Sequence, residues 1–130
     1  MSDALNTVFT FNIEGKSIGA DAKLPEAVAK TGKSGKHCLL VMREGSKPVG
    51  IISEHDIVVA FARLGHEAKH ARVRDYMTID VIAAKETDTV TDALKLMAVH
   101  NVRHLPVLSE KGQVIDFLSM MDLVIKKMTS

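Results

Sequence analysis

The sequence predicts an α+β fold in which two copies of one small unit pack about a pseudo-twofold axis and share a core. Residues 24–58 align with residues 90–124 at an offset of 66 positions, without a gap. Each copy has the hydrophobic pattern of a helix, two strands and a second helix. The 130-residue chain is 46% apolar but only 4% aromatic, so its core must be aliphatic. Units of about 55 residues are marginally stable alone, which favours one shared core.

The internal repeat falls on positions that matter for folding. Many apolar residues match apolar residues, as Leu24 with Val90 and Ile52 with Leu118. A chance alignment would not preserve the helical and strand periodicities together. The identical pairs are Ala27/Ala93, Leu39/Leu105, Val41/Val107, Glu44/Glu110, Ser53/Ser119, Asp56/Asp122 and Val58/Val124.

The second copy has clear signals for each element. Thr89 and Asp92 resemble a capping box at the start of a helix that begins at Val90 and stops at Asn101. Two short apolar segments, 104–108 and 114–118, flank the polar turn 110–113 and indicate an antiparallel hairpin. We expect the serine at 119 to cap a final amphipathic helix that runs to about residue 128.

The first copy follows the same plan, with a proline in the first turn of its first helix, where the missing N–H costs nothing. Its elements are expected at 24–34, 38–43, 48–52 and 54–64, with a turn at 44–47. The chain then divides into a leader at 1–17, a first repeat at 18–65, a polar linker at 66–72 and a second repeat at 73–130. The leader segment VFTFNI alternates and is rich in β-formers, so it can add a strand.

Composition excludes several classes of function. Lys+Arg is 17 and Asp+Glu is 16, a net charge of +1, whereas a nucleic-acid-binding domain is usually strongly basic. No apolar run approaches the ~20 residues needed to span a bilayer. The N-terminus lacks the basic and apolar regions of a signal peptide, and the single cysteine, Cys38, cannot form an intramolecular disulfide. We therefore expect a soluble, cytoplasmic protein that binds neither membrane nor nucleic acid.

The sequence offers no catalytic or metal constellation. Two Gly-Lys-Ser triplets lack the first glycine of a P-loop, because Thr10 and Ala27 stand at that position. His66 and His70 are four residues apart but have no third ligand in the sequence pattern, so we interpret them as solvated. Cys38 lies in an apolar strand and is interpreted as a buried structural thiol. The prediction is a protein that is not an enzyme and holds no metal.

Four segments of the second copy closely resemble the pattern of the cystathionine-β-synthase (CBS) domain. They are VRDYMT at 73–78, VIAAKETDTVTDALKLM at 81–97, RHLPVL at 103–108 and FLSMMDL at 117–123. The first copy is more divergent but contains a similar segment, GIISEHDI at 50–57. The resemblance covers about residues 17–128, and it implies a CBS pair of two βαββα repeats.

The resemblance also implies a function. Tandem CBS pairs commonly bind AMP, ADP, ATP, NAD or S-adenosylmethionine in clefts between the copies, form homodimers and regulate other proteins. We therefore expect a stand-alone regulatory module that binds an adenosine-containing ligand and signals to a partner protein. Two alternatives stay open. One is a structural or partner-binding CBS module with empty clefts, and the other is a regulatory subunit or fragment of an enzyme such as a dehydrogenase.

Two Ser-x-x-Asp elements are the main candidates for ligand binding: Ser53 with Asp56, and Ser119 with Asp122. A serine at a helix N-cap lies where free N–H groups and the helix dipole attract phosphate. An aspartate one turn later can accept hydrogen bonds from both ribose hydroxyls, and the resemblance implies this role. The alternative interpretation is a plain capping box, which needs no ligand.

The two Ser-x-x-Asp elements differ at the position three residues before the serine. Gly50 fits the small residue that CBS domains often carry there, whereas Asp116 stands at the matching position of the second copy. A carboxylate there is expected to repel phosphate, so we predict one strong site for each chain. The remaining candidate ligand contacts, all implied by the resemblance, are His37, Thr78, Arg103, His104 and Pro106. Pro106 has an alternative role, which is to blunt an edge strand.

Overall fold

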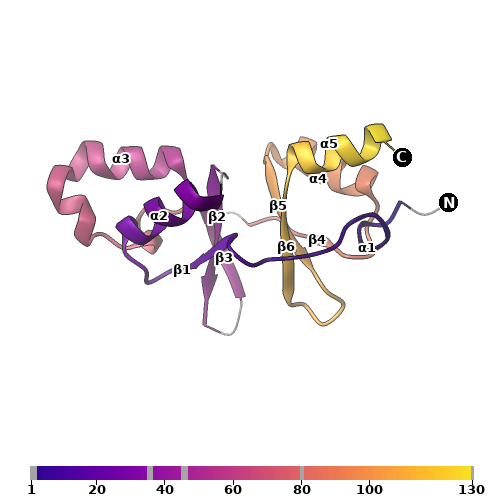
Figure 1. Cartoon of the computed structure of the whole chain (residues 1–130), viewed down its shortest axis with the longest axis horizontal. Coiled ribbons are helices and arrows are strands. Elements are labelled where there is room, and N and C mark those ends of the chain that lie inside the picture. Colours follow the sequence, from indigo (N-terminus) through magenta and orange to yellow (C-terminus); the bar gives the residue numbers. More distant parts are fainter. Residues whose placement is uncertain (1–2, 35–36, 45–46, 80, 130) are drawn as a thin grey trace. The chain divides into compact units, whose positions relative to one another are not determined.

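The computed structural model describes residues 3–34, 37–44, 47–79 and 81–129 (Figure 1). The chain forms two compact units. One consists of Glu14–Val81, and the other combines Ile82–Ser130 with Met1–Ile13. This division differs from the predicted repeats. The first unit also includes the expected linker and residues 73–81, which the sequence assigned to the second repeat, and the second unit includes most of the leader.

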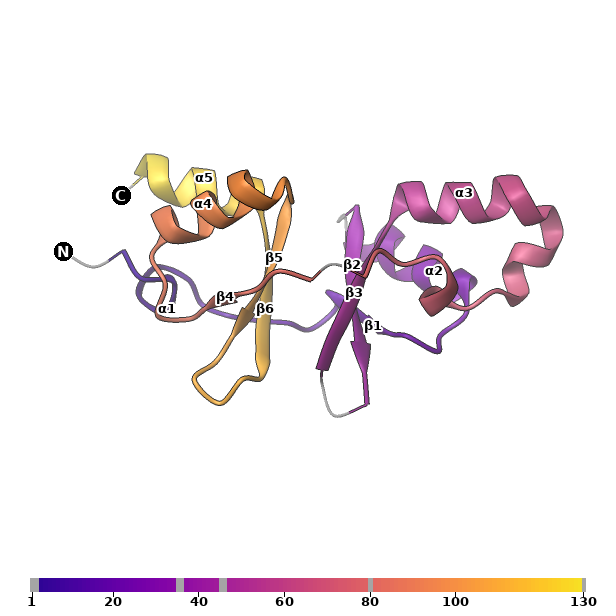
Figure 2. The same ribbon diagram turned by 180° about the vertical axis from the view of Figure 1, so that it is seen from behind.

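The unit at 14–81 is a three-stranded sheet with two helices on one face (Figures 1 and 2). Its elements are β1 (Ser17–Gly19), α2 (Leu24–Ser34), β2 (Cys38–Arg43), β3 (Lys47–Ser53) and α3 (Glu54–Leu64). The sheet order is β1-β2-β3, with β1 parallel and β3 antiparallel to the central strand. The predicted helices and strands are confirmed to within a residue or two at their ends. The predicted turn at 44–47 lies partly outside the described residues.

The second unit repeats this architecture. Its elements are β4 (Ala84–Lys85), α4 (Val90–His100), β5 (His104–Leu108), β6 (Val114–Ser119) and α5 (Met120–Thr129). The sheet order is β4-β5-β6, again with a parallel and an antiparallel neighbour for the central strand. The fold is therefore α+β with two β-α-β-β-α units, as the sequence predicted.

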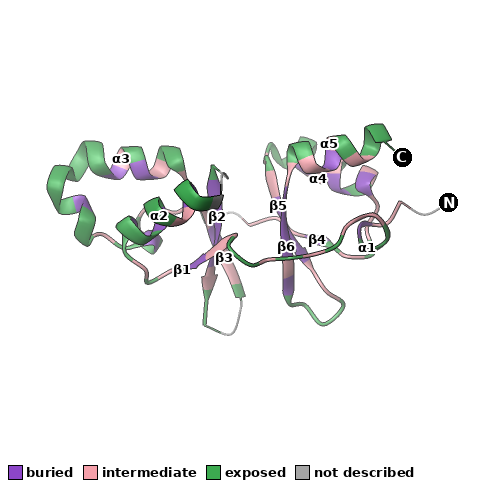
Figure 3. Ribbon diagram, viewed as in Figure 1, coloured by how far each residue is buried: buried purple, intermediate pink, exposed green. Residues whose placement is uncertain are grey.

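Aliphatic side chains between the sheet and the helices form the core of each unit (Figure 3). In the first unit Leu24, Leu39 and Ile52 are fully buried, and in the second Leu105 and Leu123 are. The inward residues of α2 and α4 recur every three or four positions. In the central strands every second residue joins the core cluster, Leu39 and Val41 in β2 and Leu105 and Val107 in β5. The residues between them, such as Leu40, are buried as well, so these strands are buried on both faces.

The segment expected as a polar linker is part of the first unit. Two 3-10 helices, Gly65–His70 and Val73–Asp75, follow α3. Ala68 and Val73 are fully buried and join the core. The Val73 N–H donates to the Ala22 carbonyl at 2.8 Å, and the Arg74 N–H donates to Ala20 at 2.9 Å. Residues 66–72 are therefore a packed element, although most of their side chains are exposed and polar.

Most of the leader belongs to the second unit, whereas residues 14–17 belong to the first, where Ser17 begins β1. The leader forms one helical turn, α1 (Leu5–Val8), and the structure assigns none of residues 8–13 to a strand. Leu5 is fully buried in the second core. Backbone hydrogen bonds join Leu5 to Asp88 at 2.8 Å and Val90 to Asp3 at 3.1 Å. The alternation of residues 8–13 instead places Phe9 and Phe11, both half-buried, against this core. Of the helices described, none is long and apolar enough to cross a membrane.

Candidate functional site

The first Ser-x-x-Asp element forms the N-terminus of α3. The Asp56 N–H donates to the Ser53 hydroxyl at 3.1 Å, and the Ser53 N–H donates to Oδ2 of Asp56 at 2.9 Å. These bonds form a reciprocal capping box. Both side chains are half-buried. Within the described residues, Oδ1 of Asp56 accepts no hydrogen bond. This oxygen is therefore available to a hydroxyl donor.

The same box occurs at two other helices. At α5 the Ser119 N–H donates to Asp122 at 2.8 Å, and the Asp122 N–H donates to the Ser119 hydroxyl at 3.1 Å. At α4 the corresponding bonds of Thr89 and Asp92 are 3.1 and 3.0 Å. Hydrogen bonds from the backbone N–H and then the hydroxyl of Thr89 lower the pKa of Asp92. The box alone therefore does not mark a ligand site, and the α4 box, with no predicted ligand role, is a natural control.

The structure divides the ten predicted site residues equally between the two units. Within the first unit, Thr78 pairs with Ile51, two residues before Ser53, by backbone hydrogen bonds of 2.9 and 2.8 Å. The His37 carbonyl accepts a 2.9 Å hydrogen bond from the first residue of α3. The structure thus gathers His37, Gly50, Ser53, Asp56 and Thr78 around the end of β3. The second unit contains Arg103, His104, Pro106, Ser119 and Asp122.

Gly50 is required by packing within its own unit. A Cβ at this position would lie 2.7 Å from the Thr78 carbonyl oxygen and 2.8 Å from the sulfur of Met77. The contact with backbone cannot be relieved by a side-chain rotation. The glycine therefore lets residues 77–78 lie against β3 and holds Thr78 beside the Ser53 element.

We predict that Gly50→Ala destabilises the first unit by about 1–3 kcal/mol, the usual cost of forcing extra atoms into a packed region. Chemical denaturation measures this change. Gly19→Ala is the matched control, because nothing lies within 4 Å of its added Cβ. Equal stability of the two variants would contradict the packing role of Gly50.

Asp116 has a different role from the one the sequence suggested. Its side chain is 2% exposed. Oδ1 accepts the Phe117 N–H at 2.7 Å, and Oδ2 accepts the Asn12 N–H at 3.4 Å. Asn12 and Phe117 match Thr78 and Ile51 at the 66-residue offset. In the first unit the N–H groups of Ile51 and Thr78 donate to each other's carbonyl oxygens. In the second unit the two equivalent N–H groups donate to the Asp116 carboxylate instead. It attaches the leader to the second unit and adds no exposed charge beside Ser119.

The basic segment that precedes β5 places three side chains in different surroundings. Arg103 is exposed, and the His104 ring stacks on Phe117 with centroids 5.2 Å apart. Pro106 is buried on the central strand of the sheet, so the interpretation that it blunts an edge is wrong. The proline is tolerated because β4 pairs only with Val107 and Leu108. The missing N–H of Pro106 therefore costs no hydrogen bond to β4.

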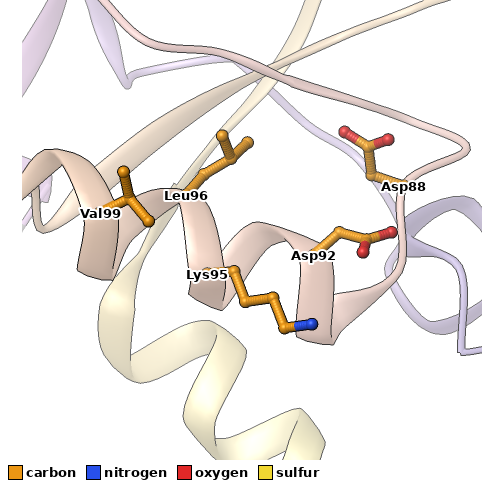
Figure 4. Close-up of a pocket in the computed structure, with 5 residues that line it drawn as sticks. All are labelled: Asp88, Asp92, Lys95, Leu96 and Val99. Carbon is orange, nitrogen blue, oxygen red and sulfur yellow. The ribbon is translucent and has the colours of Figure 1, made fainter.

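Three surface cavities in the described part of the chain are lined by none of the ten predicted site residues. One, of about 340 Å³, is lined by Asp92, Lys95, Leu96 and Val99 of α4 and by Asp88 in the segment before this helix (Figure 4). Two others occupy repeat-equivalent places at the ends of β1–β2 and β4–β5. Within the described residues, no three His, Cys, Asp or Glu side chains are placed to hold a metal ion.

Glu54 is a residue beside the candidate site that the sequence reasoning missed. It is the first residue of α3, and its Oε2 lies 3.2 Å from Nδ1 of His37. The repeat alignment could have indicated its importance, because Glu54 matches the uncharged Met120 and His37 matches Arg103. The two Ser-x-x-Asp elements therefore have different charges beside them.

Comparison with known proteins places the chain in a family. The CBS domain model matches residues 15–63 and 73–128, so the chain belongs to the CBS-domain family. Uncharacterised proteins of Methanopyrus kandleri and Acidianus ambivalens are 30% and 34% identical over 76% and 77% of this chain. The chain spans only 50% and 59% of the length of these two relatives.

Solved structures share the whole architecture. A crystal structure of a CBS domain is 35% identical, with a TM-score of 0.75, and the match covers 86% of this chain and 87% of that one. CBSX2 of Arabidopsis thaliana, solved in complex with AMP, has a TM-score of 0.78 at 20% identity, with 97% and 96% covered. The CBS domain of a bacterial CNNM/CorC family Mg²⁺ transporter, in complex with ATP, has a TM-score of 0.81 at 18% identity, with 95% and 85% covered. The chain is thus a tandem CBS pair whose structural homologues bind AMP and ATP.

Proposed function

We propose that this CBS pair is a regulatory module that binds an adenosine-containing ligand and passes its presence to a partner protein. The candidate ligands are AMP, ADP, ATP, NAD and S-adenosylmethionine. The proposed role is binding rather than catalysis. Its main support is the Asp56 carboxylate, which keeps one oxygen available for a ribose hydroxyl one turn into α3. The complexes of two structural homologues with AMP and ATP give independent support.

Thermal denaturation with each of the five ligands tests this proposal. A ligand that binds only the native state stabilises it by about 2.7 kcal/mol at a concentration of 100 times its Kd. We expect at least one of the five to raise the melting temperature in a concentration-dependent way. If none of them does so at millimolar concentration, a module that works through partner surfaces with empty clefts becomes the better account.

We also propose that the chain forms a homodimer through its helices. Ile57 of α3 and Leu123 of α5 are buried in their own units and are not available for this contact. Other apolar side chains are exposed on α3 and α5 instead. They are Val58, Phe61 and Leu64 on α3, and Met120, Met121, Ile125 and Met128 on α5, with exposed fractions of 37% to 78%.

Covering these side chains in an isologous contact would remove two apolar stripes from water. Light scattering at micromolar concentration is expected to give a mass of about twice the 14.2 kDa of one chain. Met128→Glu and Phe61→Glu should shift the protein toward the monomer. A mass of one chain for the unmodified protein would contradict the proposed dimer.

A further inference from the structure

One surface cavity of the second unit has apolar side chains at one end and carboxylates at the other. Its volume is about 340 Å³, and Leu96 and Val99 line it from α4 (Figure 4). Val99 is 77% exposed, and Leu96 is half-buried. Asp88 and Asp92 line the cavity near the start of the helix. The cavity therefore leaves apolar surface in water beside two negative charges.

Backbone hydrogen bonds hold both carboxylates in place. Oδ2 of Asp88 accepts the Lys85 N–H at 2.9 Å, and Oδ2 of Asp92 accepts the Thr89 N–H at 3.1 Å. The Asp88 carbonyl accepts the Leu5 N–H at 2.8 Å, so the leader also fixes the segment before α4. Within the described residues, Oδ1 of Asp88 accepts no hydrogen bond, and the Asp92 side chain is exposed. Both carboxylates can therefore accept hydrogen bonds from another molecule.

The first unit does not repeat this combination of side chains. At the 66-residue offset, the equivalent positions of Asp88, Asp92, Lys95, Leu96 and Val99 are Ala22, Glu26, Ala29, Lys30 and Lys33. Two aspartates and one lysine give the second-unit set a formal charge of −1, whereas one glutamate and two lysines give the first-unit set +1. Since both units have the same fold, the fold itself does not require the acidic and apolar surface at α4.

The charge and the apolar surface together define the chemistry of a partner. A net negative surface repels nucleic acid and anionic lipid, and it attracts the Lys and Arg side chains of a protein. The exposed apolar surface of Leu96 and Val99 is stabilised when another apolar side chain covers it. An amphipathic protein segment that presents an apolar and a basic side chain on one face has both features.

We propose that the α4 cavity docks a basic, amphipathic segment of the partner protein. An apolar side chain of that segment covers Leu96 and Val99, and a Lys or Arg side chain contacts the carboxylates of Asp88 and Asp92. Lys95 has the opposite charge and limits the affinity. This inference rests on the partner-binding half of the proposed function and names the surface and the class of partner. It does not depend on an adenosine ligand.

A pair of synthetic peptides tests this inference. Both are amphipathic helices with the same leucines, and their charged positions are all lysine in one peptide and all glutamate in the other. At fixed low ionic strength, the lysine peptide should shift the NMR amide signals of residues 88–99 more than those of residues 22–33. The glutamate peptide should bind several-fold more weakly, because its carboxylates are repelled by those of Asp88 and Asp92.

Single substitutions should change the affinity for the lysine peptide in opposite directions. Asp92→Asn should weaken binding by roughly 1.5- to fivefold, the range for one exposed ion pair. Lys95→Gln should strengthen binding by a similar factor, because it removes a like charge. Val99→Ser should weaken binding, because it removes exposed apolar surface. Glu26→Gln makes the matched change at the equivalent position of α2 and should leave the affinity unchanged.

Several results would overturn the proposed docking surface. One is the absence of any shift at residues 88–99, and another is equal binding of the two peptides. An effect of Glu26→Gln as large as that of Asp92→Asn would show that only the net charge of the protein matters. If concentrating the unmodified protein alone shifts the signals of residues 88–99, the occupant is a second copy of the chain and the assignment to a partner is wrong. Asp88→Asn replaces Asp92→Asn if that variant melts early. The titration contains no nucleotide, so a failure of adenosine ligands to bind is a separate result and leaves this one intact.

Discussion

Asp56→Ala should weaken binding of AMP at the α3 element by about one to two orders of magnitude. The hydrogen bonds from ribose hydroxyls to this carboxylate are charge-assisted and contribute roughly 1.5–3 kcal/mol. Since about 1.4 kcal/mol corresponds to a tenfold change in affinity, the loss is readily measured by calorimetric titration. The variant also loses the bond between Asp56 and the Ser53 N–H, so part of its effect will be on stability.

Asp92→Ala separates the two effects. The Thr89–Asp92 box at α4 has hydrogen bonds of 3.1 and 3.0 Å, similar to the 2.9 and 3.1 Å of the Ser53–Asp56 box, but has no proposed adenosine ligand. Both variants should lose stability, because each removes the carboxylate that accepts the N-cap N–H of a capping box. Only Asp56→Ala should lose affinity. A 2′,3′-dideoxy form of the ligand, which lacks the partner hydroxyls, should bind the unmodified protein weakly and show little further loss with Asp56→Ala.

The opposite result has a clear meaning. If Asp56→Ala lowers stability but binds AMP as tightly as the unmodified protein, then Asp56 only caps α3. The same conclusion follows if the dideoxy ligand binds the unmodified protein as tightly as the parent nucleotide does. Either result would leave the Ser53 element without a role in ribose recognition.

Local signals were sufficient to predict most of the fold. The helix at 24–34 and the strands at 38–43 and 104–108 have the bounds that periodicity, caps and turn residues indicated. Sequence-local rules were less informative for β1 and β4, which pair over only three residues and two residues. Such short strands are defined by their partner and not by a pattern of their own.

The assignment of segments to units depends on contacts that are distant in the sequence. Ala68 and Val73 lie in a stretch whose other side chains are polar, and nothing local shows that they reach the first core. Asn12 meets Asp116 across 104 positions. The internal repeat held usable information here, because Asn12 matches Thr78, so the repeat could have predicted that both residues lie beside equivalent strands.

The same reasoning applies to the candidate site. The spacing of Ser53 with Asp56 predicted a reciprocal cap at a helix N-terminus, and the structure has that cap. The sequence could not show that Gly50 is confined by Thr78 and Met77, because that restriction comes from a segment 27 and more residues away. It also could not show that the carboxylate of Asp116 is buried and accepts two backbone N–H groups. In both cases a distant segment decides what the side chain at the position does.

Leu5→Ala should destabilise the second unit by about 2–5 kcal/mol, the range for removing a large aliphatic side chain from a core. Leu5 is fully buried and packs in the cluster that includes Val90, Leu105 and Leu123. A dispensable leader would not show such a loss. Urea denaturation measures the change in the free energy of unfolding.

The control for this variant is Val99→Ala, which shortens an aliphatic side chain that is 77% exposed on α4 of the same unit. Its effect should lie within about 0.5 kcal/mol. Hydrogen exchange adds the location of the effect, because Leu5→Ala should accelerate exchange at the amides of β5 and β6 more than at those of β2 and β3. If Leu5→Ala is as mild as Val99→Ala, or if exchange rises equally in both sheets, the leader is not a specific part of the second core. A large loss confined to the second sheet would show that Leu5 of the leader is a specific part of the second core.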